Sequence, residues 1–137
     1  MPDDEAMTAL PRIVIRRKVE WVDTDAAGHH HHGAILRWAE AAECELLQSL
    51  GQGALFGRIP RVHYSVDYKS RLWFGQEIEV EIGIVRVGEK SLHYEFEVRT
   101  AEVVAANGKL SITFASPDSP NAVPWPDDVR KALSGGA

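Results

Sequence analysis

The feature that most constrains the fold is one segment with helical periodicity, residues 33–50, which lies between one strand-like segment and four others. Its apolar residues recur every three or four positions, whereas its charged residues fall outside that stripe. Gly51 follows the segment and predicts the end of the helix. A helix of this length extends roughly 27 Å, enough to cross the face of a small sheet. The apolar stripe consists of Ile35, Trp38, Ala39, Ala42, Leu46 and Leu50.

Five other segments alternate apolar and polar residues, which is typical of strands with one face in the core. Two turn signals, residues 88–90 and 106–108, separate the last three segments and predict a meander. The order of strand, helix and four strands predicts an α+β fold, in which a five-stranded antiparallel sheet wraps around one long central helix. The five segments are residues 13–22, 62–68, 77–87, 92–99 and 110–114.

The length of the chain, 137 residues, predicts a single domain over residues 1–137, because two ordinary cores would need a longer chain. Residues 1–11 are acidic and are expected to form a mobile leader. Residues 117–137 begin with a proline-rich stretch and are expected to form a C-terminal arm. Within that arm only residues 129–133 could add a short helical turn.

The distribution of charged and apolar residues argues against two classes of partner. The net charge is -5 at neutral pH and no basic stripe is present, so a nucleic-acid partner is not expected. No segment approaches the roughly 20 apolar residues that a membrane span requires. The first ten residues also lack the basic and apolar regions of a secretory signal, which favours a cytoplasmic location.

Residues 23–33 combine residue types that carry out chemistry. Asp23 and Asp25 precede four consecutive histidines, residues 29–32, and the small residues between them allow a tight turn. The helix that follows presents unpaired backbone N–H groups at its first turn, and a carboxylate beside such donors indicates a reaction centre. The residues alone leave two other interpretations open. Asp25 could be a turn residue, and the histidines could bind a metal ion, although neighbours in a loop rarely point at one ion.

A longer pattern extends beyond this loop. The sequence VEWVDTDAAG, residues 19–28, is followed by His32 and then by a helix that carries Glu40. The sequences RLWFGQEIEV, residues 71–80, and VRVGEKSL, residues 85–92, continue the pattern. With these motifs the chain resembles the hotdog-fold acyl-CoA thioesterases of the 4-hydroxybenzoyl-CoA thioesterase type, including the Tol-Pal-associated branch.

The resemblance covers residues 13–115 and implies both an architecture and an active site. In that family a curved sheet wraps a central helix, subunits pair with their helices side by side, and active sites lie at the dimer interface. The resemblance implies that Asp25 is the catalytic nucleophile or general base and that the backbone N–H of His32 polarises the thioester carbonyl. Many relatives have His-Ala-Asn-Tyr where residues 32–35 read HGAI, so the Asn and Tyr side chains are absent here.

Further residues are expected to contact the substrate. Gly28, His30 and His31 would line the rim of the acyl pocket, where His30 or His32 could donate to the substrate or orient Asp25. Cationic side chains near the mouth of the pocket would bind the phosphates of an acyl-CoA. The cations expected there are Lys69, Arg71, Arg86 and Lys90.

Other residues near the site are assigned structural roles. Asp23 is expected to fix the loop by accepting bonds from backbone N–H groups. Glu40 and Glu43 are expected to be solvated or paired at an interface, although some hotdog thioesterases use a helical carboxylate. Trp73 and Phe74 are expected in the core or at a dimer interface.

These observations predict an acyl-CoA thioesterase that needs no cofactor and forms a homodimer or homotetramer. Two alternatives come from other classes of protein. One is a non-catalytic module with the same fold that binds acyl-CoA or acyl-carrier protein, and the other is a metalloprotein built on the histidine loop. The sequence leaves open the acyl group, the carrier, and whether Asp25 attacks directly or activates a water.

Overall fold

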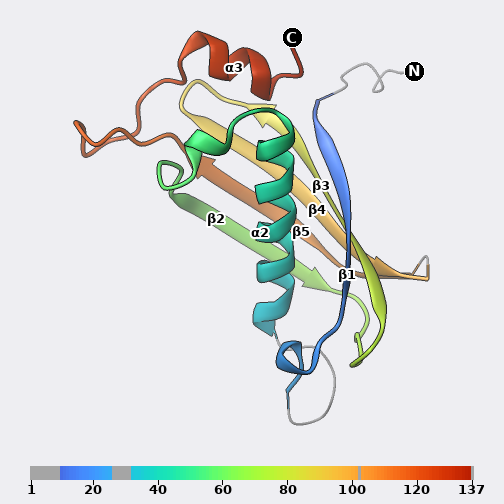
Figure 1. Ribbon diagram of the computed structural model, residues 1–137. Coiled ribbons are helices and arrows are strands. Elements are labelled where there is room, and N and C mark those ends of the chain that lie inside the picture. The colour runs from blue at the N-terminus through green and yellow to red at the C-terminus, as the bar shows by residue number, and fades with distance from the viewer. Residues whose placement is uncertain (1–9, 26–31, 102, 137) are drawn as a thin grey trace.

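The computed structural model describes residues 10–25, 32–101 and 103–136, and its five strands form one antiparallel sheet (Figure 1). The strands are β1 (Arg12–Lys18), β2 (Arg61–Tyr68), β3 (Glu77–Val87), β4 (Ser91–Thr100) and β5 (Val103–Thr113). They lie in the order β1-β3-β4-β5-β2. The α-helices are α2 (His32–Ser49) and α3 (Asp127–Leu133), and the 3-10 helices are η1 (Trp21–Asp23) and η2 (Gly53–Leu55).

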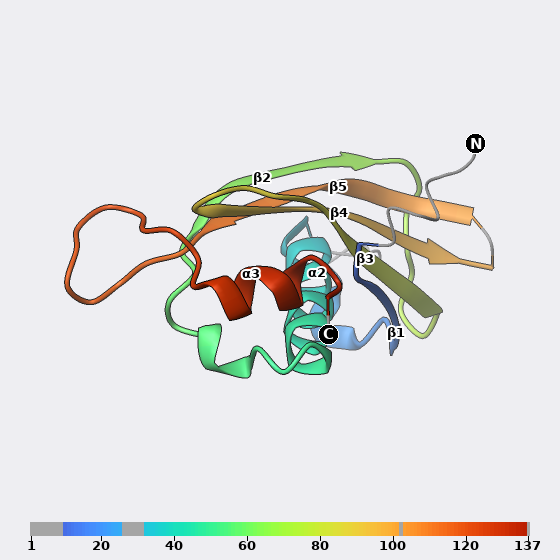
Figure 2. The ribbon, with the colours of Figure 1, turned by 90° about the horizontal axis from the view of Figure 1, so that it is seen from above.

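The antiparallel five-stranded sheet with a helix packed on it confirms the predicted α+β class. The bounds of α2, His32–Ser49, differ by one residue at each end from the predicted ones. α2 lies nearest to β3 and β1, on one face of the sheet (Figure 2). α3 contains the short helical turn predicted over residues 129–133 and begins two residues earlier, at Asp127. Within the described ranges, no helix is long and apolar enough to cross a membrane.

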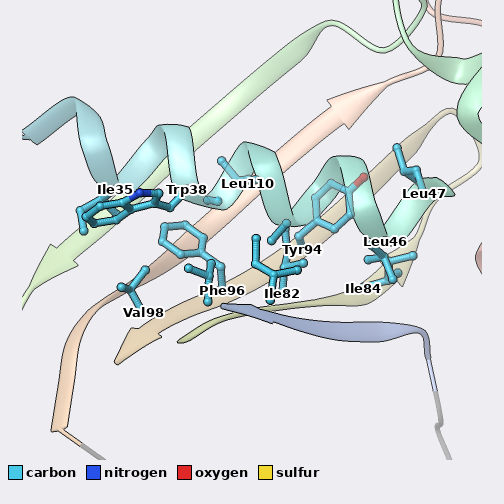
Figure 3. Packing of buried hydrophobic residues seen from close by; sticks show 14 of the residues in the cluster. Ile35, Trp38, Leu46, Leu47, Ile82, Ile84, Tyr94, Phe96, Val98 and Leu110 are labelled. Atoms are coloured by element: carbon cyan, nitrogen blue, oxygen red, sulfur yellow. The ribbon is translucent and has the colours of Figure 1, made fainter. Parts of the chain in front are cut away.

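One apolar core lies between α2 and the inner face of the sheet (Figure 3). Ile35 and Trp38, near the start of α2, lie on the side of Phe96, whereas Leu46, near its end, lies toward Ile84. All five side chains are buried. Because each buried side chain of this size contributes roughly 1.5–3 kcal/mol, the layer as a whole holds α2 on the sheet.

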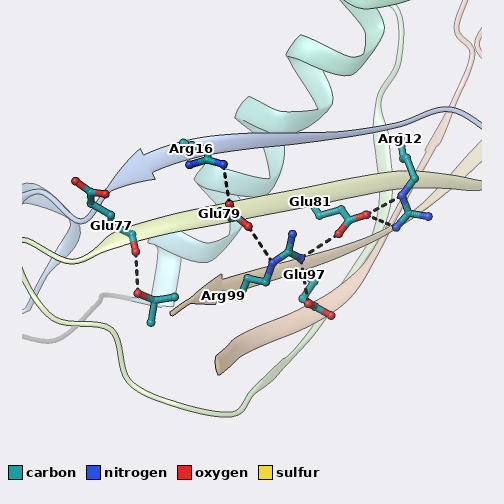
Figure 4. Close-up of polar contacts among 8 residues, drawn as sticks. Arg12, Arg16, Glu77, Glu79, Glu81, Glu97 and Arg99 are labelled. Carbon is teal, nitrogen blue, oxygen red and sulfur yellow. Dashed lines mark hydrogen bonds and ion pairs between the residues drawn. The ribbon is translucent and has the colours of Figure 1, made fainter. Parts of the chain in front are cut away.

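The outer face of the sheet carries a ladder of ion pairs across β1, β3 and β4 (Figure 4). Arg99 donates from Nε to Glu79 at 3.1 Å and from Nη1 to Glu81 at 3.0 Å, and Arg12 donates from Nε to Glu81 at 2.7 Å. Partial burial alone would raise the pKa of Glu81. The hydrogen bonds from Arg99 and Arg12 outweigh that effect and hold the pKa of Glu81 below its ordinary value.

The C-terminal segment, which the sequence predicts as an arm, returns to the turn between β3 and β4. Trp125 stacks on Phe114 with ring centroids 5.0 Å apart, and its Nε1 donates to the carbonyl of Ser91 at 3.0 Å. Arg130 of α3 donates to the carbonyl of Gly88 at 2.6 Å. These contacts bury Trp125 and hold α3 beside β3.

The turn predicted at residues 106–108 is wrong, because these residues lie inside β5, which begins at Val103. Gly108 pairs with Phe96 of β4. A Cβ atom at Gly108 would lie 2.0 Å from the carbonyl oxygen of Ser65 and 2.7 Å from the Phe96 ring. The glycine therefore permits a close approach of neighbouring strands and does not form a turn.

The strand predicted over residues 13–22 is also too long. β1 ends at Lys18, and the chain then forms η1. Trp21 is 68% exposed, although the alternation places it on the buried face. The cause is Asp23, whose buried carboxylate accepts the N–H of Glu20 at 2.8 Å and so turns the chain out of the strand.

Replacing Gly108 by Ala should lower the free energy of unfolding by about 1–3 kcal/mol, because a backbone carbonyl and an aromatic ring would both have to move. Chemical denaturation followed by tryptophan fluorescence measures this change. Gly53→Ala is the matched control, since no atom lies closer than 4.0 Å to a Cβ at that position. A loss below about 0.5 kcal/mol for Gly108→Ala would contradict this interpretation of the strand.

Candidate active site

The candidate active site lies where η1 leads toward the first turn of α2, at the lower end of Figure 1. Asp25 is the last residue described before His32 and is half-buried. α2 begins at His32, of which only the backbone is described. The expected substrate contacts Gly28, His30 and His31 lie outside the described residues. Among the residues that the structure does describe, no group of three or more potential metal ligands occurs.

Asp23 fixes the path of the chain toward α2. Its side chain is buried, and one carboxylate oxygen accepts the N–H of Glu20 at 2.8 Å. The other oxygen pairs with the guanidinium of Arg37 on α2. A buried carboxylate is stable only with such partners, so this contact ties η1 to the helix. The structural role predicted for Asp23 is confirmed.

Backbone hydrogen bonds hold the same segment to the start of β3. Val19 donates to the carbonyl of Gln76 at 2.8 Å, and Gly75 donates to the carbonyl of Val19 at 2.8 Å. Thr24 donates to the carbonyl of Trp21 from its N–H at 3.1 Å and from its hydroxyl at 2.7 Å. Asp25 therefore comes directly after a segment that is held to the start of β3 by hydrogen bonds and to α2 by the ion pair between Asp23 and Arg37.

The first turn of α2 offers a second chemical element. In an α-helix the first four N–H groups have no acceptor within the helix, and the helix dipole adds partial positive charge at that end. The first turn of α2 contains no acidic side chain that would neutralise this field. A helix start of this kind stabilises an anion, such as a carboxylate or the oxygen of a thioester carbonyl as charge develops on it.

The four expected phosphate-binding cations divide between the two ends of the sheet. Lys69 and Arg71 are exposed in the loop that follows β2, and this loop leads to the start of β3, at the η1 end. Arg86 lies at the other end of β3, about 30 Å along the strand, and Lys90 lies in the turn beyond it. A single chain thus brings only two of the four cations to the end that carries Asp25.

Arg86 belongs to a polar cluster on the outer face that the sequence analysis did not find. His93 is hydrogen-bonded to Ser91 at 3.0 Å and to Ser111 at 2.9 Å, and its Nε2 lies 3.5 Å from Nη1 of Arg86. Burial, and then the charge of Arg86, lower the pKa of His93. Arg86 lies opposite His93 because a bulge in β3, between Ile84 and Arg86, shifts the register of β3 against β4.

Glu43 forms a second polar cluster between α2 and β2. Nη2 of Arg61 donates to Glu43 at 2.9 Å and to Glu40 at 3.0 Å. Glu40 is exposed, in line with the prediction, although it pairs with Arg61. Glu43 is buried within its own chain, so the expected solvated or interface position is wrong for Glu43. Burial, and then the charge of Glu43, raise the pKa of Tyr94. The cluster holds the first residue of β2 against the helix.

Comparisons with known proteins give a family and several relatives. Residues 19–133 match the family model described as Thioesterase-like superfamily. A protein of Synechococcus sp. (strain CC9605), named 1,4-dihydroxy-2-naphthoyl-CoA hydrolase, is 29% identical over 138 aligned positions, which cover 93% of this chain and 93% of the relative.

Two solved structures are similar over nearly the whole chain. One is the structure of a predicted thioesterase from Bacillus stearothermophilus, with a TM-score of 0.83 and 26% identity, covering 92% of this chain and 96% of that one. The other is a thioesterase complexed with coenzyme A and Zn from Thermus thermophilus, with a TM-score of 0.80 and 25% identity, covering 90% and 95%.

Lowering the pH should destabilise the protein through His93. Its pKa in the folded state lies below the ordinary value of 6.5, so the unfolded chain binds this proton first. The contribution of His93 to stability is complete above that value and is lost as the pH falls through the lowered pKa. His93→Gln should therefore flatten the pH dependence of the unfolding free energy between about pH 7 and pH 5.

The control for this measurement is Gln48→Ala, which changes an exposed side chain of α2 that carries no titratable group. It should keep the pH dependence of the parent. If His93→Gln and the parent lose stability equally on acidification, the cluster around His93 does not contribute to stability as described.

Proposed function

The chain belongs to the Thioesterase-like superfamily, and from that premise we propose that this thioester hydrolase cleaves an acyl-CoA with Asp25 as nucleophile or general base. The backbone N–H of His32 would donate to the carbonyl oxygen of the thioester. The observation that carries the proposal is the anchored segment before the loop, in which Asp23 pairs with Arg37 of α2. This contact keeps the end of η1, and with it Asp25, close to the helix that begins at His32.

Two reaction routes are consistent with these residues. In one, a carboxylate oxygen of Asp25 attacks the acyl carbon, the C–S bond breaks, and the CoA thiolate leaves before water hydrolyses the resulting anhydride. In the other, Asp25 takes a proton from a water whose oxygen attacks the acyl carbon, and the thiolate leaves in the same way. Both routes place negative charge on the carbonyl oxygen, where a helix N–H stabilises it.

The relatives guide the choice of acyl group. The Synechococcus relative is named 1,4-dihydroxy-2-naphthoyl-CoA hydrolase and aligns with nearly the full chain. A hydroxylated aromatic acyl group is therefore the first substrate class to test. The proposal includes the finer assignment of the protein to the 4-hydroxybenzoyl-CoA thioesterase type or to its Tol-Pal-associated branch. The rates of hydrolysis of a panel of acyl-CoA substrates distinguish between these two assignments.

The four cations expected to bind phosphate lie at opposite ends of the sheet, which favours a site shared between subunits. Lys69 and Arg71 lie toward the end that carries Asp25, whereas Arg86 and Lys90 lie at the far end of the same chain. In a pair whose helices lie side by side and whose two-fold axis is perpendicular to them, the far end of one subunit lies beside the near end of the other. Such a homodimer, alone or within a homotetramer, would bring all four cations to each site.

Asp25→Asn should lower kcat/KM for 1,4-dihydroxy-2-naphthoyl-CoA by about 100- to 10,000-fold, because the amide can neither attack nor accept a proton. Release of CoA thiol, followed with a thiol reagent, measures the rate. The panel should also contain 4-hydroxybenzoyl-CoA and a straight-chain acyl-CoA. Glu95→Gln, which changes an exposed carboxylate in the middle of β4, away from both ends of the sheet, is the control and should match the parent.

Two outcomes would contradict this proposal. Equal rates for Asp25→Asn and the parent would remove the assignment of Asp25. Tight binding of acyl-CoA by the parent without release of thiol from any member of the panel would favour a non-catalytic binding module with the same fold.

A further inference from the structure

The turn between β3 and β4 is held in place through its carbonyl groups. Counted from the last residue of β3 to the first residue of β4, it spans residues 87–91 and lies beside α3, at the end of the sheet opposite η1 (Figure 1). Arg130 of α3 donates from Nη2 to the carbonyl of Val87 at 3.3 Å and from Nη1 to the carbonyl of Gly88 at 2.6 Å. One guanidinium thus binds the first two carbonyls of the turn.

Two aromatic residues supply donors to the other three carbonyls. The backbone N–H of Trp125 donates to the carbonyl of Glu89 at 3.1 Å, and its Nε1 donates to the carbonyl of Ser91 at 3.0 Å. The backbone N–H of Phe114, on which Trp125 stacks, donates to the carbonyl of Lys90 at 3.0 Å. Donors from the chain after β5 therefore occupy every carbonyl group of the turn.

The turn presents donors and positive charges to solvent. Among the described residues, no atom accepts a hydrogen bond from the backbone N–H groups of Glu89 and Lys90. Consecutive backbone N–H groups in a turn are a common element of anion-binding sites. The side chains of Arg86 and Lys90 are exposed, and neither pairs with a carboxylate within the described ranges. Glu89 is the one acidic residue between positions 86 and 91, so positive charge prevails there.

The ring of His93 places Arg86 at the base of the turn. Nη1 of Arg86 lies 3.5 Å from Nε2 of His93, and the same nitrogen is hydrogen-bonded to the hydroxyl of Ser91 at 3.0 Å. In contrast, the guanidinium groups of Arg12 and Arg99 pair with glutamates of β3. The guanidinium of Arg86 is thus fixed beside the turn without being neutralised, and its geometry suits a phosphate group.

We propose that Arg130 and Trp125 are positioning residues for substrate binding, because they hold the β3–β4 turn in the shape that binds the phosphate groups of CoA. The inference rests on the proposed function, which supplies the class of substrate. A turn whose carbonyls are all held loses little conformational entropy when it binds a ligand. The C-terminal segment therefore contributes to affinity for CoA without contacting it, whereas Arg86, Lys90 and the N–H groups of the turn make the contacts.

Kinetics with two thioesters of the same acyl group test the proposal. One is 1,4-dihydroxy-2-naphthoyl-CoA, and the other is the pantetheine thioester of the same acid, which lacks the phosphate groups. Arg130→Ala should raise KM for the CoA thioester about tenfold and leave kcat unchanged, because only the binding of the phosphates is weakened. KM for the pantetheine thioester should stay within about twofold of the parent value. The Kd of free CoA, measured by isothermal titration calorimetry, should rise about tenfold as well.

Three further variants separate positioning from charge and from folding. Lys131→Ala removes an exposed cation from the same helix and should bind CoA like the parent. Arg130→Lys keeps the charge and can still donate to one carbonyl, so its Kd should lie within about threefold of the parent value. Trp125→Phe keeps a buried ring on Phe114 but removes the donor to Ser91, and should raise the Kd about threefold. Circular dichroism verifies that each variant is folded.

The outcomes distinguish this inference from the proposed function. Equal Kd values of CoA for the parent and Arg130→Ala would overturn the inference, even if both proteins release thiol at the same rate. Equal losses for the CoA and pantetheine thioesters would also overturn it, because the C-terminal segment would then only support the fold. If the parent binds CoA and the variants differ as described, the inference stands, even if no acyl-CoA is hydrolysed. A parent that neither binds CoA nor hydrolyses its thioesters would overturn both.

Discussion

The buried carboxylate of Asp23 is the contact on which the candidate site depends. It accepts the N–H of Glu20 and pairs with Arg37, so one side chain shapes η1 and ties it to α2. Neither partner can be removed without leaving a buried charge poorly satisfied, which is costly in a protein interior. The direction in which Asp25 leaves η1 and the outward position of Trp21 both follow from this turn.

Particular segments show how much of the fold the sequence predicts. The alternation in β3 and β4 predicts the buried face of each strand, because that face packs against α2 while the other meets solvent. The prediction fails at Gly108, since Asn-Gly is the usual signal of a hairpin turn. The local sequence cannot show that Phe96 and the carbonyl of Ser65 approach this glycine from neighbouring strands.

The candidate site is predicted less completely, because its parts come from distant segments. Asp23 and Asp25 stand out in the local pattern of the loop. The burial of Glu43 depends on Arg61, which lies 18 residues away and reaches the helix from the edge strand β2. The exposure of Trp21 depends on a turn that a side chain makes. Period-two alternation cannot record a side-chain contact of this kind.

The central claim is that Asp25 and the first backbone N–H of α2 act together on the thioester. A proline at the start of the helix tests this claim most directly. His32→Pro removes that N–H at a helical position where proline fits, whereas His32→Ala keeps the N–H and removes only the side chain. The account predicts that kcat for acyl-CoA hydrolysis is about 100- to 1000-fold lower for His32→Pro than for His32→Ala. Equal values of kcat for two folded variants would contradict it.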